Sequence, residues 1–182
     1  GRGGFAEFAI LPAAILRRKP ANMTFGQAAS YPVCYLTAYV ALKRCADAQP
    51  GEWVLVHGAA GGVGLAAVDY AKILGCKVIA ASASDEKLAV IEREYDVDAT
   101  VNVTRGFRER VKEITGGKGA DVIYDPVGGD IFDESTRCIA FGGRILSIGF
   151  TSGRLPVLPV NIALIKGFSV HGVRAGEYGR QF

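Results

Sequence analysis

Short runs rich in valine and isoleucine alternate along the chain with stretches whose apolar residues recur at helical spacing. The runs show little alternation of apolar and polar positions, which is typical of strands buried on both faces of a sheet. The predicted strands cover 53–58, 77–82, 99–103, 121–125, 144–149 and 168–173. Strands that alternate with helices indicate an α/β fold: a doubly wound six-stranded parallel sheet with helices on both faces.

The stretches between these strands carry helix signals of their own. Apolar residues recur at helical spacing over 63–74, with Gly75 as the stop, and again over 107–114. Ser84 is a predicted N-cap, because acidic residues fill the next turn, where they favour the positive end of a helix. A further short helix is predicted over 160–166.

The first 20 residues do not follow this alternation. The segment GGFAEFAIL over 3–11 predicts an isolated strand that belongs to another domain. The last residues, GEYGRQF, predict no closing element. From both ends we expect the chain to be a fragment of a longer protein.

Composition excludes several classes of function. The chain has 182 residues, 49% of them hydrophobic, and a net charge of +3 with both signs mixed throughout, which argues against nucleic-acid binding. No apolar run reaches the roughly 18 residues of a membrane span. The cysteines, at positions 34, 45, 76 and 138, show no CxxC spacing and are expected to be free thiols in a reducing compartment, hence a cytoplasmic protein.

The loop after the first predicted strand holds four glycines in seven residues. It reads GAAGGVG over 58–64, a variant of the dinucleotide-binding pattern G-x-G-x-x-G, without the Gly-Lys-Ser/Thr of a Walker loop. Glycine allows the backbone to approach a pyrophosphate, and free N–H groups at the helix start donate to its oxygens. We therefore expect a dinucleotide here. The alternative is a glycine turn that only joins strand to helix.

No acidic residue ends the second predicted strand, where an NAD enzyme usually places Asp or Glu for the ribose 2′-OH. The strand runs instead into Ser82, with Ser84 and Lys87 close behind. Hydroxyls and an ammonium group suit a 2′-phosphate, which a carboxylate would repel. The sequence therefore predicts NADP(H), against the counter-evidence of Asp85 and Glu86. For Lys87 the alternative is a solvated helix lysine.

Three segments carry a family resemblance: GEWVLVHGAAGGVGLAAVDYAKILGCKVIAASAS, VIYDPVGGDIFDESTRCIAFGGRILSIGFTSG and PVNIALIKGFSVHGV. They closely resemble the quinone oxidoreductase (zeta-crystallin-like) branch of the zinc-independent medium-chain dehydrogenase/reductases. The motifs AAGGVG, DPVGG and IGFTSG together are far more specific than a glycine loop alone. The resemblance implies a Rossmann domain over 21–182 that binds NADPH, and a remnant of a GroES-like substrate domain over 1–20.

The resemblance also implies which residues contact the cofactor. The loop 60–64 would hold the pyrophosphate, the second strand end the 2′-phosphate, and the later loops the adenosine and nicotinamide. The predicted cofactor-binding residues are Thr37, Ala60, Gly61, Gly62, Val63, Gly64, Ser82, Ser84, Lys87, Val127, Ile148, Gly149, Phe150 and Val170. Many relatives have a tyrosine after the third strand that assists the 2′-phosphate. Val103 stands there in this chain, which weakens the NADP assignment.

For activity, the resemblance implies hydride transfer from NADPH to a quinone or an α,β-unsaturated carbonyl compound. Such a transfer needs no metal, because the acceptor's carbonyl delocalises the charge. We predict no metal site and name no catalytic residue; His57, Tyr124 and Asp125 are interpreted as structural. The alternatives are an enoyl-thioester (enoyl-CoA or acyl-carrier) reductase and a non-catalytic cofactor-binding module. The isolated fragment is expected to be inactive.

The last predicted strand favours self-association. By the strand count it lies at an edge of the sheet, and it contains neither proline nor lysine, the residues that commonly protect such edges. We expect a homodimer that pairs this strand with its copy, as many members of the resembled family do. The alternative is that a C-terminal segment covers the edge.

Overall fold

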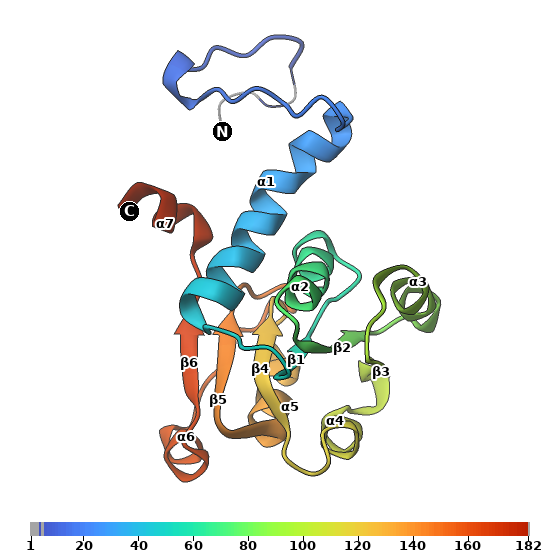
Figure 1. Cartoon of the computed structure of the whole chain (residues 1–182). Helices are drawn as coiled ribbons and strands as arrows, with labels where there is room; N and C mark the ends of the chain where they lie inside the picture. The colour runs from blue at the N-terminus through green and yellow to red at the C-terminus, as the bar shows by residue number, and fades with distance from the viewer. Residues whose placement is uncertain (1–3, 5, 182) are drawn as a thin grey trace.

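The computed structural model describes residue 4 and residues 6–181, and in it six strands form one sheet (Figure 1). The order is β3-β2-β1-β4-β5-β6, and every neighbouring pair is parallel. The strands are β1 Trp53–Val56, β2 Lys77–Ser82, β3 Ala99–Asn102, β4 Ala120–Asp125, β5 Ile139–Ser147 and β6 Ser169–Gly172. The predicted doubly wound sheet is confirmed, and the strand order reverses between β1 and β4.

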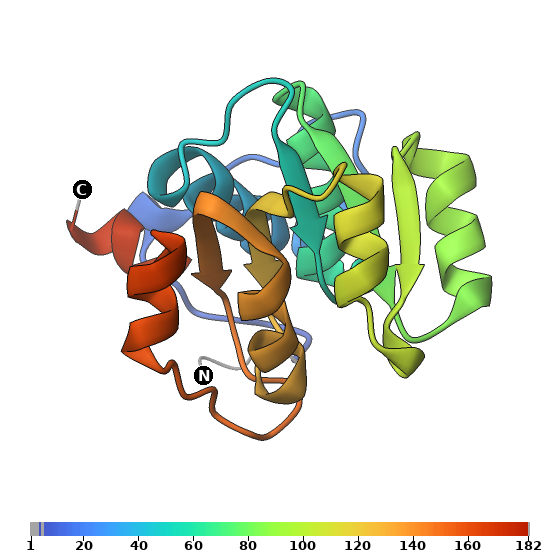
Figure 2. The ribbon, with the colours of Figure 1, turned by 90° about the horizontal axis from the view of Figure 1, so that it is seen from below.

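Helices connect the strands and cover both faces of the sheet (Figure 2). They are α1 Phe25–Tyr39, α2 Gly62–Ile73, α3 Asp85–Tyr95, α4 Arg108–Ile114, α5 Gly129–Cys138, α6 Val160–Lys166 and α7 Ala175–Gln181. Short 3₁₀ turns lie at Ala13–Ile15 and Val103–Arg105, and a π-helical segment, Val40–Cys45, continues α1.

The core consists of two apolar clusters, one on each face of the sheet. Val54, Val56 and Tyr124 point to the face covered by α1, α2 and α3. Leu55 and Ile123 point to the opposite face, where α4 and α5 pack. Neighbouring residues of one strand thus enter different clusters, which explains why the strand sequences are apolar without alternation.

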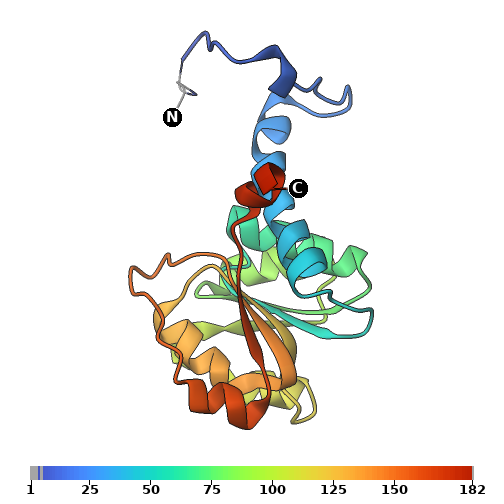
Figure 3. The same cartoon turned by 90° about the vertical axis from the view of Figure 1, so that its left-hand side faces the viewer.

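The predicted helices at 63–74, 107–114, 160–166 and after Ser84 are confirmed, and the Ser84 hydroxyl accepts from the Lys87 N–H at 3.3 Å. Helices α1, α5 and α7 were not individually predicted. For α1 a signal was present: Thr24 and Gln27 form a capping box, in which each side chain accepts from the other residue's N–H. The expectation that no element closes the chain is wrong, because α7 forms there and packs against α1 (Figure 3).

The strand predicted over 3–11 is wrong as far as the structure describes it. Residues 3 and 5 lie outside the described residues; residues 4 and 6–11 form no strand. A lone strand leaves its backbone N–H and C=O groups unpaired, and none of the described strands pairs with this segment. The four cysteines are free thiols, and no described helix is long and apolar enough to cross a membrane.

Candidate functional site

Loops that follow β1, β2, β4 and β5 meet beyond the carboxyl ends of these strands, next to the point where the strand order reverses. They enclose an open cleft of about 520 Å³. The cleft is lined by Gly58, Ala60, Gly61, Gly62, Val63, Ser82, Ala83, Ser84, Lys87, Pro126, Val127 and Thr151. In open parallel sheets this crevice is where ligands bind.

The glycines of the β1–α2 loop have two different roles. A Cβ at Gly64 would lie 2.1 Å from the Gly58 carbonyl oxygen, so only glycine lets α2 pack this closely on the loop that follows β1. Gly61 and Gly62 are exposed, and the nearest atoms to their added Cβ atoms lie at 3.3 and 3.2 Å. Both glycines line the cleft, and without side chains they leave the loop backbone accessible to a ligand.

The start of α2 supplies hydrogen-bond donors to this surface. Helix α2 begins at Gly62, and the Leu65 N–H is the first to bond within it, to the Gly61 carbonyl at 2.8 Å. The N–H groups of the preceding residues, 62–64, have no intrahelical acceptor by their position. An anion such as a pyrophosphate would accept from them, and the positive end of the helix dipole would add to the attraction.

The end of β2 presents hydroxyls and an ammonium group, without a lining carboxylate. Ser82, Ser84 and Lys87 line the cleft, and Asp85 and Glu86 do not. The Asp85 carboxylate instead accepts from the Asn102 side-chain amide at 2.6 Å. The groups that face the cleft therefore fit a phosphate better than a ribose hydroxyl.

A buried carboxylate shapes the opposite wall. Asp125, 1% exposed at the end of β4, accepts from the N–H groups of Val127 and Gly128 at 2.8 and 2.9 Å. Burial raises the pKa of Asp125, and the two hydrogen bonds oppose this shift. Its role is to fix the β4–α5 loop, which agrees with the structural interpretation made from the sequence.

The loop after β5 is fastened to the same wall. The N–H of Thr151 donates to the Pro126 carbonyl at 3.2 Å, and the N–H of Ser152 donates to the Val127 carbonyl at 3.0 Å. Arg154 then bridges to Asp130 and Asp133 on α5. Thr151 thereby reaches the cleft, although it was not among the predicted residues.

Eight of the fourteen predicted residues line this cleft: Ala60, Gly61, Gly62, Val63, Ser82, Ser84, Lys87 and Val127. The others lie around it or beyond it. Gly64 is buried against the loop that follows β1, and residues 148–150 follow β5 beside the β4–α5 loop. Thr37 donates from its hydroxyl to the Val33 carbonyl within α1, and Val170 is on β6. Their predicted contacts with a cofactor stay predictions.

Four lining residues were not among the predicted cofactor-binding residues: Gly58, Ala83, Pro126 and Thr151. The motifs that contain Pro126 and Thr151, DPVGG and IGFTSG, had nevertheless been recognised. The available signal was topological. Because β1 and β4 flank the reversal of strand order, the residue after β4 must face the glycine loop.

His57 lies beneath the site and does not face it. It is 1% exposed, its Nε2 lies 2.9 Å from the Ser135 hydroxyl, and its ring meets Phe107 edge-on. Burial lowers its pKa to about 3. Tyr124 is also fully buried, and burial raises its pKa. Both are structural, as predicted. Among the described residues no three His, Cys, Asp or Glu side chains cluster as metal ligands would.

A second hollow, of about 590 Å³, lies between α4 and α5. Four arginines and four acidic residues line it, and several of them pair with one another or with backbone groups. It has no glycine loop and is not at the reversal of strand order. The cleft is therefore the candidate site.

A family model described as "Zinc-binding dehydrogenase" matches residues 62–181, which include the last three residues of the glycine loop, the β2 end and the β4–α5 loop. The chain belongs to this family. The resemblance to quinone oxidoreductases is confirmed by relatives: "Quinone oxidoreductase-like protein 2 homolog" of Nematostella vectensis is 44% identical over 98% of this chain and 49% of its own length.

Solved structures of the family share the fold. A mycobacterial protein complexed with NADPH aligns with a TM-score of 0.89 and 32% identity, over 98% of this chain and 55% of that one. The CurK enoyl reductase aligns with a TM-score of 0.79 and 30% identity, over 90% and 48%. The chain spans about half the length of the relatives that it matches.

Proposed function

We propose that the chain is the NADPH-binding part of a zinc-independent oxidoreductase that transfers hydride to a quinone or an α,β-unsaturated carbonyl compound. The observation that carries the proposal is the cleft at the reversal of strand order. One end presents backbone N–H groups at a glycine loop, and the other presents Ser82, Ser84 and Lys87 with no lining carboxylate. The NADPH complex of the mycobacterial relative and the names of the quinone oxidoreductase-like relatives support it.

In this proposal the chain binds and orients the cofactor. The start of α2 would hold the pyrophosphate through the N–H groups of residues 62–64, and Lys87 with the two serines would hold the 2′-phosphate. The bound cofactor supplies the hydride. The Asp125 carboxylate fixes the loop that contains Val127, and the Thr151 N–H ties the β5 loop to it, so the walls are rigid before binding.

The activity is tested on the full-length protein. NADPH oxidation is followed with quinones, with simple enones and with enoyl-CoA esters, each with NADH as a parallel donor. The proposal expects turnover of quinones or enones with NADPH, unaffected by prolonged dialysis against a zinc chelator. Turnover only with an alcohol substrate, or activity that is lost on chelation and restored by zinc, would contradict it.

An enoyl-thioester reductase is the second candidate, and the similarity to the CurK enoyl reductase favours it. It would use the same cleft and cofactor. In the same assay, an enoyl-CoA ester turned over at a kcat/KM far above that of any quinone or simple enone would support this candidate. NADPH binding without turnover of any acceptor by the full-length protein would support a non-catalytic binding module.

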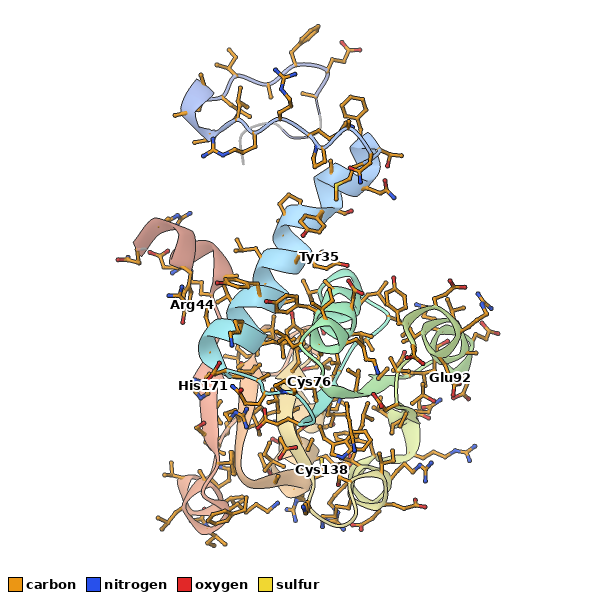
Figure 4. All side chains as sticks on the ribbon, viewed as in Figure 1. Tyr35, Arg44, Cys76, Glu92, Cys138 and His171 are labelled. Carbon is orange, nitrogen blue, oxygen red and sulfur yellow. The ribbon has the colours of Figure 1, made fainter. Side chains whose placement is uncertain are left out.

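We further propose a homodimer formed through β6. This strand pairs only with β5 among the described strands, Val170 is 37% exposed, and the next segment, α7, packs against α1. His171 lies on the same strand (Figure 4). Exposed apolar side chains on α6, Val160, Leu164 and Ile165, extend the surface that a second copy would cover.

A further inference from the structure

Asp85 is the first acidic residue after β2, three positions beyond Ser82. A carboxylate that followed the end of β2 into the cleft would repel a 2′-phosphate and would accept from a ribose 2′-OH. The structure directs this carboxylate elsewhere. Its Oδ1 accepts from Asn102 Nδ2 at 2.6 Å, and Asp85 is absent from the cleft lining.

Asn102 is oriented for this contact by its own neighbours. It ends β3 and lies in register with Ser82, the last residue of β2. The two strands are neighbours in the sheet (Figure 1). Its Oδ1 accepts from both the N–H and the hydroxyl of Thr104, at 3.0 and 2.7 Å. Because the carbonyl oxygen of the side chain is bound to Thr104, the amide NH₂ faces Asp85.

We propose that Asn102 is a specificity-determining residue for the cofactor: it holds the Asp85 carboxylate on the β3 side and so keeps the β2 end suited to a 2′-phosphate. The inference rests on the proposed NADPH site and adds a residue that does not line the cleft. Asn102 acts through Asp85, so it is a positioning residue. Val103 follows it directly, and the chain thus has a device for NADPH selectivity that does not depend on a tyrosine at that position.

The test is a set of variants of the full-length protein, with the dissociation constants of NADPH and NADH measured by calorimetry. In Asn102→Ala the released Asp85 carboxylate gains access to the β2 end. The NADPH dissociation constant is expected to rise about threefold to tenfold, which corresponds to roughly 0.7–1.4 kcal/mol, while that of NADH changes less or falls. Adding Asp85→Asn to this variant is expected to return NADPH affinity close to that of the unmodified protein.

Glu86→Gln in the Asn102→Ala background is the matched control. It removes the charge of a neighbouring α3 residue that lines a different hollow, so it is expected to restore little of the NADPH affinity. Asn102→Ala also removes the hydrogen bonds that Asn102 Oδ1 accepts from Thr104. Thermal unfolding of each variant therefore separates a folding defect from an effect on binding.

Three results would overturn the inference. The first two are an equal loss of NADPH and NADH affinity in Asn102→Ala, and a failure of Asp85→Asn to restore NADPH affinity in a folded double variant. Failure of the proposed function is distinct, because the unmodified protein would then show no preference for NADPH. The third result is an equal restoration of NADPH affinity by Glu86→Gln, which would show that any negative charge near the phosphate has the same effect and would overturn the inference.

Discussion

Among the described residues that line the cleft, Lys87 is the only one with a charged side chain. It is exposed on the first turn of α3, beside the Ser84 cap, so solvent weakens any ion pair that it forms. This position fits a contact with a phosphate at the β2 end and gives the exposed lysine a role beyond surface charge.

We expect Lys87→Ala to weaken NADPH binding about fivefold, roughly 1 kcal/mol. A charge-assisted hydrogen bond at an exposed site contributes less than a buried one. NADH, which lacks the 2′-phosphate, should change much less. Calorimetric titration of both cofactors measures the difference, with Lys118→Ala, remote from the cleft, as the control. An equal loss for the two cofactors would show that Lys87 does not contact the 2′-phosphate.

His57 links a single residue to the stability of the fold. Its pKa is lowered to about 3 by burial, whereas in the unfolded chain it lies near 6.5. Between these values the unfolded chain binds the extra proton, so stability falls as the pH falls through this window. The loss reaches at most about 1.4 kcal/mol per pH unit.

Urea denaturation at pH 7, 6 and 5 tests this expectation. The unmodified chain should lose more stability on acidification than His57→Asn, which keeps a polar side chain without a titrating group. The same pH dependence in both proteins would show that the buried imidazole does not titrate on unfolding.

At the scale of elements, the packing of α2 onto the loop that follows β1 depends on Gly64. An alanine there would place its Cβ 2.1 Å from the Gly58 carbonyl oxygen, and the atoms that it meets belong to the backbone, so the loop or the helix must shift. We expect Gly64→Ala to lower the free energy of unfolding by about 1–3 kcal/mol or more, as overpacking does. Gly62→Ala, whose Cβ meets only the Cys34 sulfur at 3.2 Å, should lower the free energy of unfolding much less. Equal stability of the two variants would contradict this account of the loop.

The elements that carry apolar runs could be predicted from the sequence, and those that depend on tertiary contacts could not. All six strands were located, because buried parallel strands are apolar on both faces. The start of β5 at Ile139 was missed: Gly142 and Gly143 interrupt the apolar pattern, and a register shift lies opposite, between Ala120 and Val122 of β4. In α1, Pro32 interrupts the helical pattern.

The candidate site was predictable where one segment supplies it, as at 60–63, Ser82, Ser84 and Lys87. The hydrogen bond between Asn102 and Asp85 was not predictable, because it joins residues 17 positions apart. It depends on the register of β2 with β3 and on the turn at Thr104. Under the proposal, such an interaction decides whether a nearby carboxylate reaches the 2′-phosphate position and weakens NADPH binding.

For the whole molecule, the proposed dimer is tested by sedimentation at high concentration. The unmodified protein should sediment as a dimer. Val170→Lys should shift it toward a monomer, because a charge at the middle of β6 opposes antiparallel pairing with a second copy. Ile73→Lys, on the exposed face of α2, is the control and should remain a dimer. A monomer without any substitution, or a dimer unchanged by Val170→Lys, would contradict the proposal.

The central claim is that the cleft at the reversal of strand order binds NADPH against the glycine loop, and calorimetric titration of Gly62→Val tests it most directly. Gly62 lines the cleft at the first turn of α2, so we expect a branched side chain there to hinder the approach of the pyrophosphate. NADPH affinity should then fall about tenfold or more, at least 1.4 kcal/mol. Gly176→Val on α7, where no atom lies within 4 Å of an added Cβ, should bind as the unmodified protein does. A folded Gly62→Val protein with unchanged NADPH affinity would contradict the account.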